Sequence, residues 1–301
     1  MKKTLFGLLG LIAAVVAFSQ QPPAATPAAA ATNAAPGGGR GRGGGGFKQP
    51  DPIDFEDHTG WTSMWDGATL KGWDGDFNYW EVENGAIVVE STCEKPTGTI
   101  YLIWQGGEPA DFEMKLEMKG EGAMVNSGVQ YRGAITKPRP PQPAGAAPGA
   151  GRGRGPQGPC PSGAARGTPP SRESQAKWDM LGAQFDFDGR NQYSGQYYEQ
   201  ATGRGIIAWR GQVVRTEEGK SPRLLATLGN PEELGGFVKI EGWNQFHIIA
   251  RGNTMTHIIN GHVMSVLIDD DPTKFRKSGL IGVEIEGTGK ISMRNLWLKK
   301  L

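Results

Sequence analysis

Polar and charged side chains gather between Trp178 and Arg210, a stretch that is also rich in aromatic residues and glycines. From Ala183 to Asp188 the sequence Ala-Gln-Phe-Asp-Phe-Asp alternates, so an extended strand places Gln184, Asp186 and Asp188 on one face. The opposite face is apolar and is expected to belong to a core. The polar face is either a solvated surface or the floor of a site for polar, sugar-like molecules.

Other side chains of this stretch could contact the same molecule. Glu199 offers a carboxylate and Arg204 a guanidinium, while the rings of Tyr198 and Trp209 could stack on a sugar. Core packing is the default role of a tryptophan in a sheet protein, so packing and stacking both remain open for Trp209.

Several familiar chemistries lack support in the sequence. It contains neither Gly-x-Ser-x-Gly nor Gly-x-x-x-x-Gly-Lys-Ser/Thr, which argues against a serine hydrolase and a phosphate-binding loop. A formal net charge of +1 gives no attraction to nucleic acid, and we expect no nucleic-acid partner. No cofactor is certain. A hard divalent cation such as Ca²⁺ could bind Asp186, Asp188, Glu199 and Glu286, although no contiguous calcium-binding loop is present.

Three tracts of the chain are not expected to enter a core. Residues 1–19 combine two lysines, an apolar run and small residues at the cleavage positions, which predicts a cleaved secretory signal peptide. An uncleaved anchor helix is the alternative. Residues 20–56 predict a disordered linker rich in Ala, Pro and Gly, and residues 134–176 predict a disordered insertion in a domain of residues 57–301. The mature protein is therefore expected to be periplasmic or secreted, without stable membrane insertion.

The chain has two cysteines, Cys93 and Cys160. An oxidising compartment would allow them to pair, but their spacing does not itself indicate a bridge. Because Cys160 lies in the low-complexity insertion, we do not expect a structural disulfide.

The remaining sequence consists of short extended runs between turns, and helical periodicity never lasts more than a turn or two. Asn260-Gly261 is suited to a two-residue hairpin loop. Many antiparallel strands at this spacing predict an all-β sandwich or jelly roll of two sheets. The expected strands are Trp80–Glu90 with a turn at 83–85, Phe112–Lys119, Val125–Arg132, Ala183–Asp188, Gly205–Val214, Trp243–Arg251, Thr254–Ile259, His262–Ile268, Gly279–Glu286 and Lys290–Lys299.

A series of sequence elements follows the order found in a known family. These elements are Gly60-Trp61-Thr62-Ser63-Met64-Trp65-Asp66-Gly67, Leu70-Lys71-Gly72-Trp73, Trp80-Glu81-Val82-Glu83-Asn84-Gly85, Asn126-Ser127-Gly128-Val129-Gln130-Tyr131-Arg132, the strand from Gly182 to Asp186, Gly242-Trp243-Asn244, Arg251-Gly252-Asn253 and His257-Ile258-Ile259-Asn260-Gly261. Together they resemble the 3-keto-disaccharide hydrolase domain family over nearly all of residues 58–301, apart from the insertion.

The resemblance implies a concanavalin A-like jelly roll in which one curved sheet holds carbohydrate in a groove. It also implies a hydrolase that cleaves glycosidic bonds of 3-keto-disaccharides or 3-keto-glycosides, supplied by a separate sugar 3-oxidoreductase. A ketone at C3 acidifies the hydrogen at C2, so a base can remove it, the glycosidic oxygen leaves C1 by elimination, and water adds to the enone. A non-catalytic carbohydrate-binding module on the same fold is the alternative.

The resemblance also suggests roles for individual residues. Glu117 lies in a strand that the family places in the groove sheet and is the first candidate base, with a solvated strand position as the alternative. Gln184 and Asp186 could bind sugar hydroxyls or transfer protons. Asn126 begins the matched Asn-Ser-Gly strand. Arg132 ends it and could donate to the enolate oxygen or form a structural salt bridge with Asp186.

Two further positions remain open. His257 shares a face with Met255 and Ile259 by alternation, so a core histidine and an acid or base role are both possible. Where the family reads Ile-Gly-Leu-Gln-x-His-Gly, this chain has Ile-Gly-Val-Glu-Ile-Glu-Gly over residues 281–287, so Glu286 replaces an imidazole. Asp188, Tyr198 and Glu199 lie in an elaboration of this chain, where we expect its substrate preference to be determined.

Overall fold

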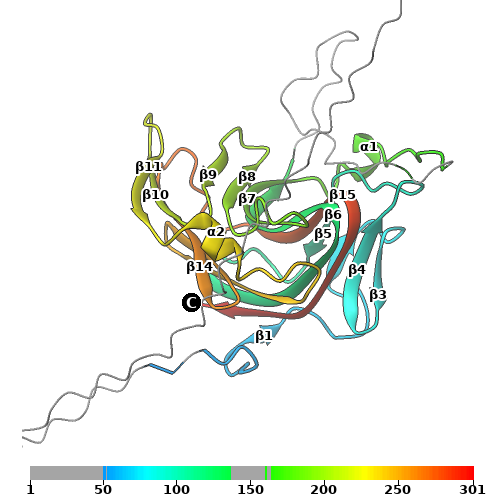
Figure 1. Cartoon of the computed structure of the whole chain (residues 1–301), viewed down its shortest axis with the longest axis horizontal. Helices are drawn as coiled ribbons and strands as arrows, with labels where there is room; N and C mark the ends of the chain where they lie inside the picture. Colours follow the sequence, from blue (N-terminus) through cyan, green and yellow to red (C-terminus); the bar gives the residue numbers. More distant parts are fainter. Residues whose placement is uncertain (1–49, 52, 137–159, 161–163) are drawn as a thin grey trace, which may run out of the picture. The chain divides into compact units, whose positions relative to one another are not determined.

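Two long strands contribute to both layers of the domain. β6 (Phe112–Ile135) and β15 (Leu280–Lys300) pair antiparallel along their whole length, from Leu280 opposite Gly133 to Lys300 opposite Phe112. Figure 1 shows them curving side by side through the domain. Register shifts interrupt the pairing at three points, and such irregularities bend strands. One half of each strand therefore lies in each layer.

One layer, named here the groove sheet, has the strand order β9-β8-β7-β6-β15-β5-β2. It uses the second half of β6 and the first half of β15. Its other strands are β2 (Trp73–Gly75), β5 (Ile100–Trp104), β7 (Met180–Asp188), β8 (Tyr197–Gln200) and β9 (Gly205–Ala208).

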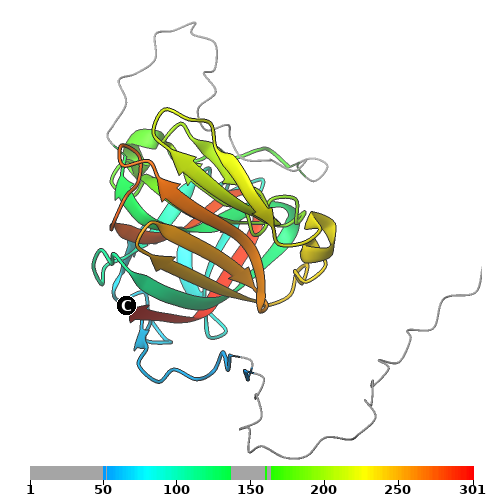
Figure 2. The same cartoon turned by 90° about the vertical axis from the view of Figure 1, so that its left-hand side faces the viewer.

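The other layer, named here the back sheet, has the order β11-β10-β14-β13-β12-β6-β15-β4-β3, and Figure 2 shows several of its strands face on. β10 and β14 are parallel, whereas the other neighbours in this sheet are antiparallel. Its strands are β1 (Thr62–Ser63), which pairs with β15, β3 (Trp80–Glu83), β4 (Ala86–Ser91), β10 (Gln212–Glu217), β11 (Arg223–Thr227), β12 (Asn244–Arg251), β13 (Thr254–Ile259) and β14 (His262–Asp270).

The hydrophobic core lies between the two sheets. Phe112, Met114, Leu116 and Met118 of β6 are completely buried, as their alternation predicts. Phe185 of the groove sheet contacts Phe246 of the back sheet at a ring-centroid distance of 5.0 Å. Each such side chain contributes about 1.5–3 kcal/mol through burial, so the core fixes which face of each strand points outward.

The computed structural model describes residues 50, 51, 53–136, 160 and 164–301. The predicted signal peptide, most of the predicted linker and most of the predicted insertion lie outside these residues. Residues Pro52–Leu301 form one compact unit. Phe55 is buried and its carbonyl accepts a hydrogen bond from Lys115 Nζ at 2.6 Å, so the folded part begins slightly before residue 57. No helix in the described part of the chain is long and apolar enough to cross a bilayer.

The all-β sandwich is confirmed, with local differences from the expected strands. The two runs predicted within residues 112–132 form one strand, and so do the two within residues 279–299. The run Gly205–Val214 divides into β9 and β10 because the chain turns at Gly211, whose φ is +89°. Two short helices, α1 (Arg172–Gln175) and α2 (Pro231–Gly235), were not expected from the periodicity.

The last part of the insertion packs against the domain. Cys93 and Cys160 form a disulfide with a Cα–Cα distance of 5.4 Å, so the expectation of no structural pair is wrong. Gly167 N donates to Cys93 O at 2.9 Å, and Gln175 Nε2 donates to Asp76 Oδ2 at 2.8 Å. These contacts hold Gly167 and Gln175 against the domain, which the low-complexity composition did not reveal.

Candidate functional site

An open groove with a volume of about 420 Å³ lies on the outer face of the groove sheet. Its volume falls in the usual range for small-molecule sites. Alternation along β7 places Gln184 and Asp186 in the groove, whereas Phe185 and Phe187 enter the core. The groove is lined by Asn126, Gln184, Asp186, Tyr193, Gln196, Tyr198, Gln200, Ile206, Trp209, Glu284 and Glu286. Six of these were predicted as site residues: Asn126, Gln184, Asp186, Tyr198, Trp209 and Glu286.

The strand register brings two groove carboxyls into one row. Asp186 of β7 and Glu284 of β15 both lie opposite Gly128 of β6, one on each side. Neighbouring strands are about 4.8 Å apart, so the two backbones are separated by about 10 Å and both side chains reach into the same groove. Such an arrangement lets two carboxyls approach one small substrate from different sides.

The glycine between these carboxyls is required by a close approach. A Cβ atom at Gly128 would lie 2.7 Å from Gln184 Nε2 and 2.8 Å from Gln184 Cγ. Because Gly128 has no Cβ atom, the Gln184 side chain can cross β6 and donate a hydrogen bond to Glu284 Oε2. Glu284 also accepts hydrogen bonds at Oε1 from Tyr101 OH at 2.7 Å and from Gln200 Nε2 at 3.4 Å. Amide and phenol donors therefore orient the Glu284 carboxylate.

Asp186 is buried in a negatively charged environment. Burial raises its pKa well above the usual range, and the nearby carboxylates of Glu284, Asp188 and Glu286 raise it further. A hydrogen bond from Gln196 Nε2 opposes this shift but does not reverse it. None of the described residues that line the groove is a lysine, arginine or histidine. Asp186 can therefore carry a proton at a pH where an ordinary aspartate has lost it.

Glu286 lies at the polar end of the groove. Its Oε1 accepts a hydrogen bond from Thr99 Oγ1 at 2.9 Å, and its Oε2 accepts one from Asn126 Nδ2 at 3.1 Å. The replacement of an imidazole by this carboxylate thus leaves a hydrogen-bonded carboxylate and amide pair next to the Asp186 and Glu284 row.

The opposite end of the groove is aromatic. Trp209 is 47% exposed, and its ring lies 6.4 Å from that of Tyr193. Tyr198 and Ile206 are cross-strand neighbours on β8 and β9 and complete this apolar wall. For Trp209 the structure therefore favours the stacking interpretation over core packing.

Asp188 does not line the groove but shapes the turn beside it. Its Oδ1 accepts hydrogen bonds from the backbone N–H groups of Tyr193 at 2.7 Å and Ser194 at 3.0 Å, and its Oδ2 accepts one from Gln192 at 3.1 Å. The predicted role in direct substrate contact is corrected to that of a residue that positions Tyr193.

Glu117 is not in the groove. It lies in the first half of β6, opposite Gln245 of β12 in the back sheet, and accepts a hydrogen bond from Arg294 Nε at 2.7 Å. The core separates it from the groove because Leu116 and Met118 point between the sheets. The expected placement of Glu117 in the groove sheet is wrong, since β6 changes layers between residues 119 and 126.

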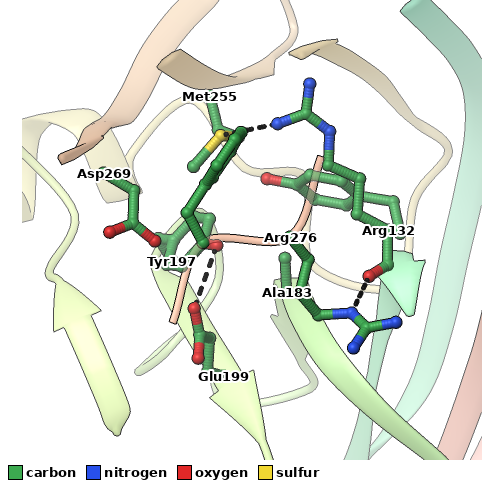
Figure 3. A pocket seen from close by; sticks show the side chains of 9 residues that line it. Arg132, Ala183, Tyr197, Glu199, Met255, Asp269 and Arg276 are labelled. Atoms are coloured by element: carbon green, nitrogen blue, oxygen red, sulfur yellow. Dashed lines mark hydrogen bonds between the residues drawn. The ribbon is translucent and has the colours of Figure 1, made fainter. Parts of the chain in front are cut away.

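Arg132 is also directed away from the groove. Its side chain is buried and donates to the carbonyl of Ala110 at 2.7 Å and to that of Gly252 at 2.8 Å, and it pairs with Asp111 at 3.2 Å. It borders a cavity of only about 10 Å³, seen in Figure 3, which is too small for a sugar. Its salt-bridge partner is Asp111 rather than Asp186, and a donor role toward an enolate is not supported.

His257 is a core residue. Its Nε2 lies 2.8 Å from Tyr131 OH, its Nδ1 lies 3.2 Å from Gln196 O, and its ring stacks on Phe185. Burial lowers its pKa to about 3, so the imidazole is neutral. A carbonyl can only accept, so Nδ1 carries the proton and Nε2 accepts from the tyrosine. Of the two predicted roles, the structure supports the core histidine.

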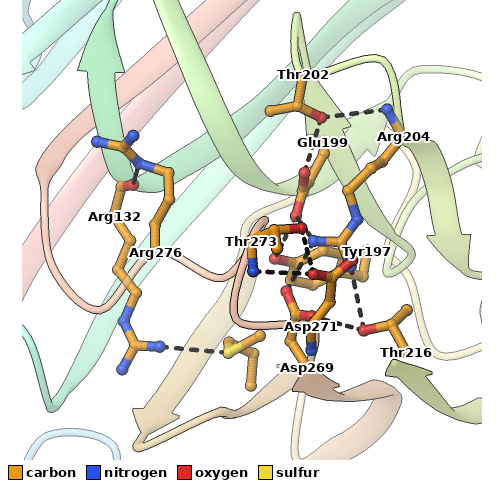
Figure 4. A network of polar contacts seen from close by, with 11 residues as sticks. Arg132, Tyr197, Glu199, Thr202, Arg204, Thr216, Asp269, Asp271, Thr273 and Arg276 are labelled. Carbon is orange, nitrogen blue, oxygen red and sulfur yellow. Dashed lines mark hydrogen bonds and ion pairs between the residues drawn. The ribbon is translucent and has the colours of Figure 1, made fainter. Parts of the chain in front are cut away.

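Glu199 and Arg204 form an ion network on the inner side of β8. Arg204 Nη1 contacts Glu199 Oε1 at 3.0 Å and Asp269 Oδ2 at 2.7 Å, and Nη2 donates to Thr216 Oγ1 at 3.2 Å. Figure 4 shows these side chains converging on one another. The predicted substrate contacts of Glu199 and Arg204 are corrected, because Tyr198 takes the groove face of β8 and alternation turns Glu199 inward.

Three groove residues with a carboxyl or amide side chain were not predicted as site residues: Glu284, Gln196 and Gln200. Glu284 stands two positions before Glu286, so period-two alternation already put both carboxylates on one face. Gln200 stands two positions after Tyr198 in the same way. Gln196 lies in the turn before β8, and no periodic signal indicated its position.

The carboxylates considered for a divalent cation do not converge. Within the described residues, no three His, Cys, Asp or Glu side chains form a group that could hold a metal ion. Asp188 binds backbone N–H groups, and Glu199 is paired with Arg204 on the other side of the sheet.

Comparison with known proteins identifies a family match. The family model for the 3-keto-alpha-glucoside-1,2-lyase-like domain matches residues 60–299. No curated protein matches the sequence.

Similar folds occur among solved structures. A Parabacteroides distasonis protein provisionally assigned as a glycosyl hydrolase is 15% identical, with a TM-score of 0.45 over 84% of this chain and 100% of its own. The Bacillus subtilis carbohydrate-binding module CBM66 is 10% identical, with a TM-score of 0.41 over 81% of this chain and 98% of its own.

Proposed function

This chain belongs to the family of 3-keto-alpha-glucoside-1,2-lyase-like domains, and we propose that it cleaves the glycosidic bond of 3-keto-glycosides in the groove. The observation that carries the proposal is the row of two carboxyls on either side of Gly128. One of them, Asp186, has a raised pKa, and the other, Glu284, is oriented by hydrogen-bond donors. An acid and a base facing one small substrate are what elimination requires.

The carboxylate of Glu284 acts as the base. It removes the proton from C2, which the C3 ketone acidifies, and the electron pair moves into an enolate on the C3 oxygen. The amides of Asn126 and Gln196 each donate one N–H to a groove carboxyl and supply their second N–H for this oxygen or for a sugar hydroxyl.

The carboxyl of Asp186 acts as the acid. When the enolate collapses, the bond between C1 and the glycosidic oxygen breaks, and Asp186 gives its proton to the departing oxygen. The products are the free alcohol and an enone with a C1–C2 double bond. Addition of water to C1 and C2 converts this enone into the free 3-keto sugar, which gives net hydrolysis.

The chemistry of the substrate places this reaction after an oxidation. An ordinary glycoside carries a hydroxyl at C3, so a separate sugar 3-oxidoreductase must first convert it to the ketone. Residues 1–19 predict export, and the mature protein would then act in the periplasm or outside the cell. N-terminal sequencing of the protein from the periplasmic fraction would test that cleavage.

A comparison of oxidised and unoxidised substrates tests the function. We expect the purified protein to convert 3-keto derivatives of trehalose and sucrose, with release of 3-ketoglucose or appearance of enone absorbance, and to leave the unoxidised sugars unchanged. Turnover of the unoxidised sugars would contradict the elimination mechanism. Binding of both forms without turnover would indicate a non-catalytic carbohydrate-binding module instead of an enzyme.

A further inference from the structure

The groove divides into two chemically different halves along the strand order. The half over β7, β6 and β15 carries all the carboxyls and two of the four amides of the groove, including Asp186, Asn126 and Glu284. The half over β8, β9 and the adjoining turns carries an apolar wall of Tyr193, Tyr198, Ile206 and Trp209. It also carries the amides of Gln196 and Gln200, whose Nε2 groups donate to Asp186 and Glu284 of the first half. The four wall residues themselves include no carboxyl, amide or basic side chain. Asp186 lies on β7, next to the boundary between the two halves.

The aromatic half is held by a polar scaffold outside the groove. Asp188 fixes the turn that carries Tyr193 through three backbone N–H groups. Arg210, which follows Trp209, donates to the carbonyls of Asn191 at 3.1 Å and Ser194 at 2.9 Å, and its Nε donates to that of Pro231 at 2.8 Å. The guanidinium therefore ties the Trp209 turn to the Tyr193 turn. A rigidly held ring binds a ligand with a smaller loss of conformational entropy than a mobile ring does.

We propose that this aromatic half is a leaving-group subsite for a flat aromatic aglycone, with Trp209 as its specificity-determining residue. The inference rests on the proposed function, in which Asp186 protonates the glycosidic oxygen. Because Asp186 lies at the boundary, the ketone-bearing ring occupies the carboxyl half and the departing group occupies the aromatic half. The substrates are then 3-keto aryl glycosides.

An aryl group fits this wall better than a second sugar does. A sugar ring carries hydroxyls around its edge, and burial of a hydroxyl without a hydrogen-bond partner costs roughly 1–3 kcal/mol. The two tyrosine hydroxyls are the only side-chain polar groups of the wall apart from the indole N–H. A phenyl ring needs no such partners and stacks on the exposed face of Trp209.

Kinetics with matched leaving groups test the proposal. Phenyl, methyl and glucosyl 3-keto-α-glucosides would be compared with the wild type, Trp209→Ala and Trp209→Phe. We expect Trp209→Ala to lower kcat/KM for the phenyl compound about 10-fold, the loss expected for a buried stacking contact, and to change that for the methyl compound less than about 2-fold. Trp209→Phe keeps a ring and should lose less. Phe77→Ala removes an aromatic ring that is 55% exposed outside the groove and serves as the matched control.

A binding measurement separates this inference from the proposed function. Calorimetry with unoxidised phenyl and methyl α-glucosides requires no turnover, and Trp209→Ala should weaken only the phenyl ligand, again about 10-fold. If Trp209→Ala weakened binding of the phenyl ligand alone and no 3-keto compound were converted, the aromatic-binding subsite would be supported and the proposed enzymatic activity would be rejected. Equal losses for phenyl and methyl compounds would overturn the subsite. A loss confined to the glucosyl compound would also overturn it, because the wall would then bind a second sugar.

Discussion

Buried carboxyls lie on both faces of the groove sheet, but their electrostatic surroundings differ. On the outer face, Asp186 and Glu284 share a groove whose described lining residues include no basic side chain. On the inner face, Glu199 contacts Arg204 at 3.0 Å, and Arg204 also contacts Asp269 of β14 in the back sheet at 2.7 Å. Both groups are formed by acidic residues on strands, and the sequence alone does not distinguish them.

The partner of a buried carboxyl determines what that carboxyl can do. Burial raises the pKa of Glu199, but the charge of Arg204 and a hydrogen bond from Thr202 oppose the shift. The ion pair of Glu199 and Arg204 serves to hold neighbouring segments together. Asp186 has only the Gln196 amide to oppose burial and neighbouring negative charge, so its proton is available for chemistry. The outer group is suited to catalysis and the inner group to stability.

Removal of the outer carboxyls is the largest expected effect. Glu284→Gln and Asp186→Asn should each lower kcat for a 3-keto-glycoside by about 10²–10⁴-fold, the range for loss of general acid or base catalysis. The far-ultraviolet circular dichroism spectrum and the cooperative thermal transition should remain. Because neither replacement changes the side-chain size much, an unchanged rate would mean that these groups only contact the substrate.

The inner group supplies the control for this comparison. Glu199→Gln keeps an oxygen that can accept hydrogen bonds from Arg204 and Thr202, and it leaves Arg204 paired with Asp269. Its rate should stay within about 2-fold of the wild type, since Glu199 does not line the groove. A loss of rate as large as that of Glu284→Gln would contradict the proposal that the outer carboxyls serve catalysis and the inner carboxyls serve stability.

Alternation along a strand predicts which side chains share a face, but it does not predict in which of the two sheets the strand lies. For this reason some site residues were predicted correctly and others were not. Gln184 and Asp186 were found because alternation and family order agreed on β7. Glu117 alternates just as well, yet β6 runs through both layers and leaves it on the back sheet. The bend in β6 depends on pairing with β15, which is more than a hundred residues away, and no local pattern reports it.

Other errors had a local remedy. Tyr198 and Glu199 are neighbours on one strand and cannot face the same side, so strict alternation would have kept Glu199 out of the groove. The same rule applied to Glu286 would have added Glu284. By contrast, the Arg204 network depends on Asp269 of β14, a contact between distant segments that a single sequence does not show.

Removal of the Arg204 guanidinium is expected to reduce stability rather than activity. Arg204→Met leaves Glu199 and Asp269 buried without a positive partner, and breaking a buried pair in this way costs about 3–5 kcal/mol. Chemical denaturation should show this loss as a lower midpoint, and the rate per folded molecule should stay near that of the wild type. A variant that keeps its midpoint but loses activity would move Arg204 into the functional site.

The smallest expected effect is a gain in stability when Asp186 is replaced by Asn. The folded-state pKa of Asp186 is raised above the unfolded value of about 3.9, so its stabilising contribution is present below that pH and is lost as the pH rises toward the folded value. Asn cannot ionise and retains an oxygen for the Gln196 donor. Asp186→Asn should therefore raise Tm at pH 7 by roughly 2–4 °C, the shift produced by about 1 kcal/mol, and the gain should disappear near pH 4.

An aspartate with a lowered pKa provides the matched control for this sign. Hydrogen bonds from Thr69 and Ala68 lower the pKa of Asp66 to about 2, so it stabilises the fold above the unfolded pKa and loses that contribution as the pH falls. Asp66→Asn should therefore lower Tm at pH 7, with the loss shrinking in acid. If both variants lowered Tm at pH 7, Asp186 would be a stabilising carboxylate like Asp66, and its role as a proton donor would lose its physical basis.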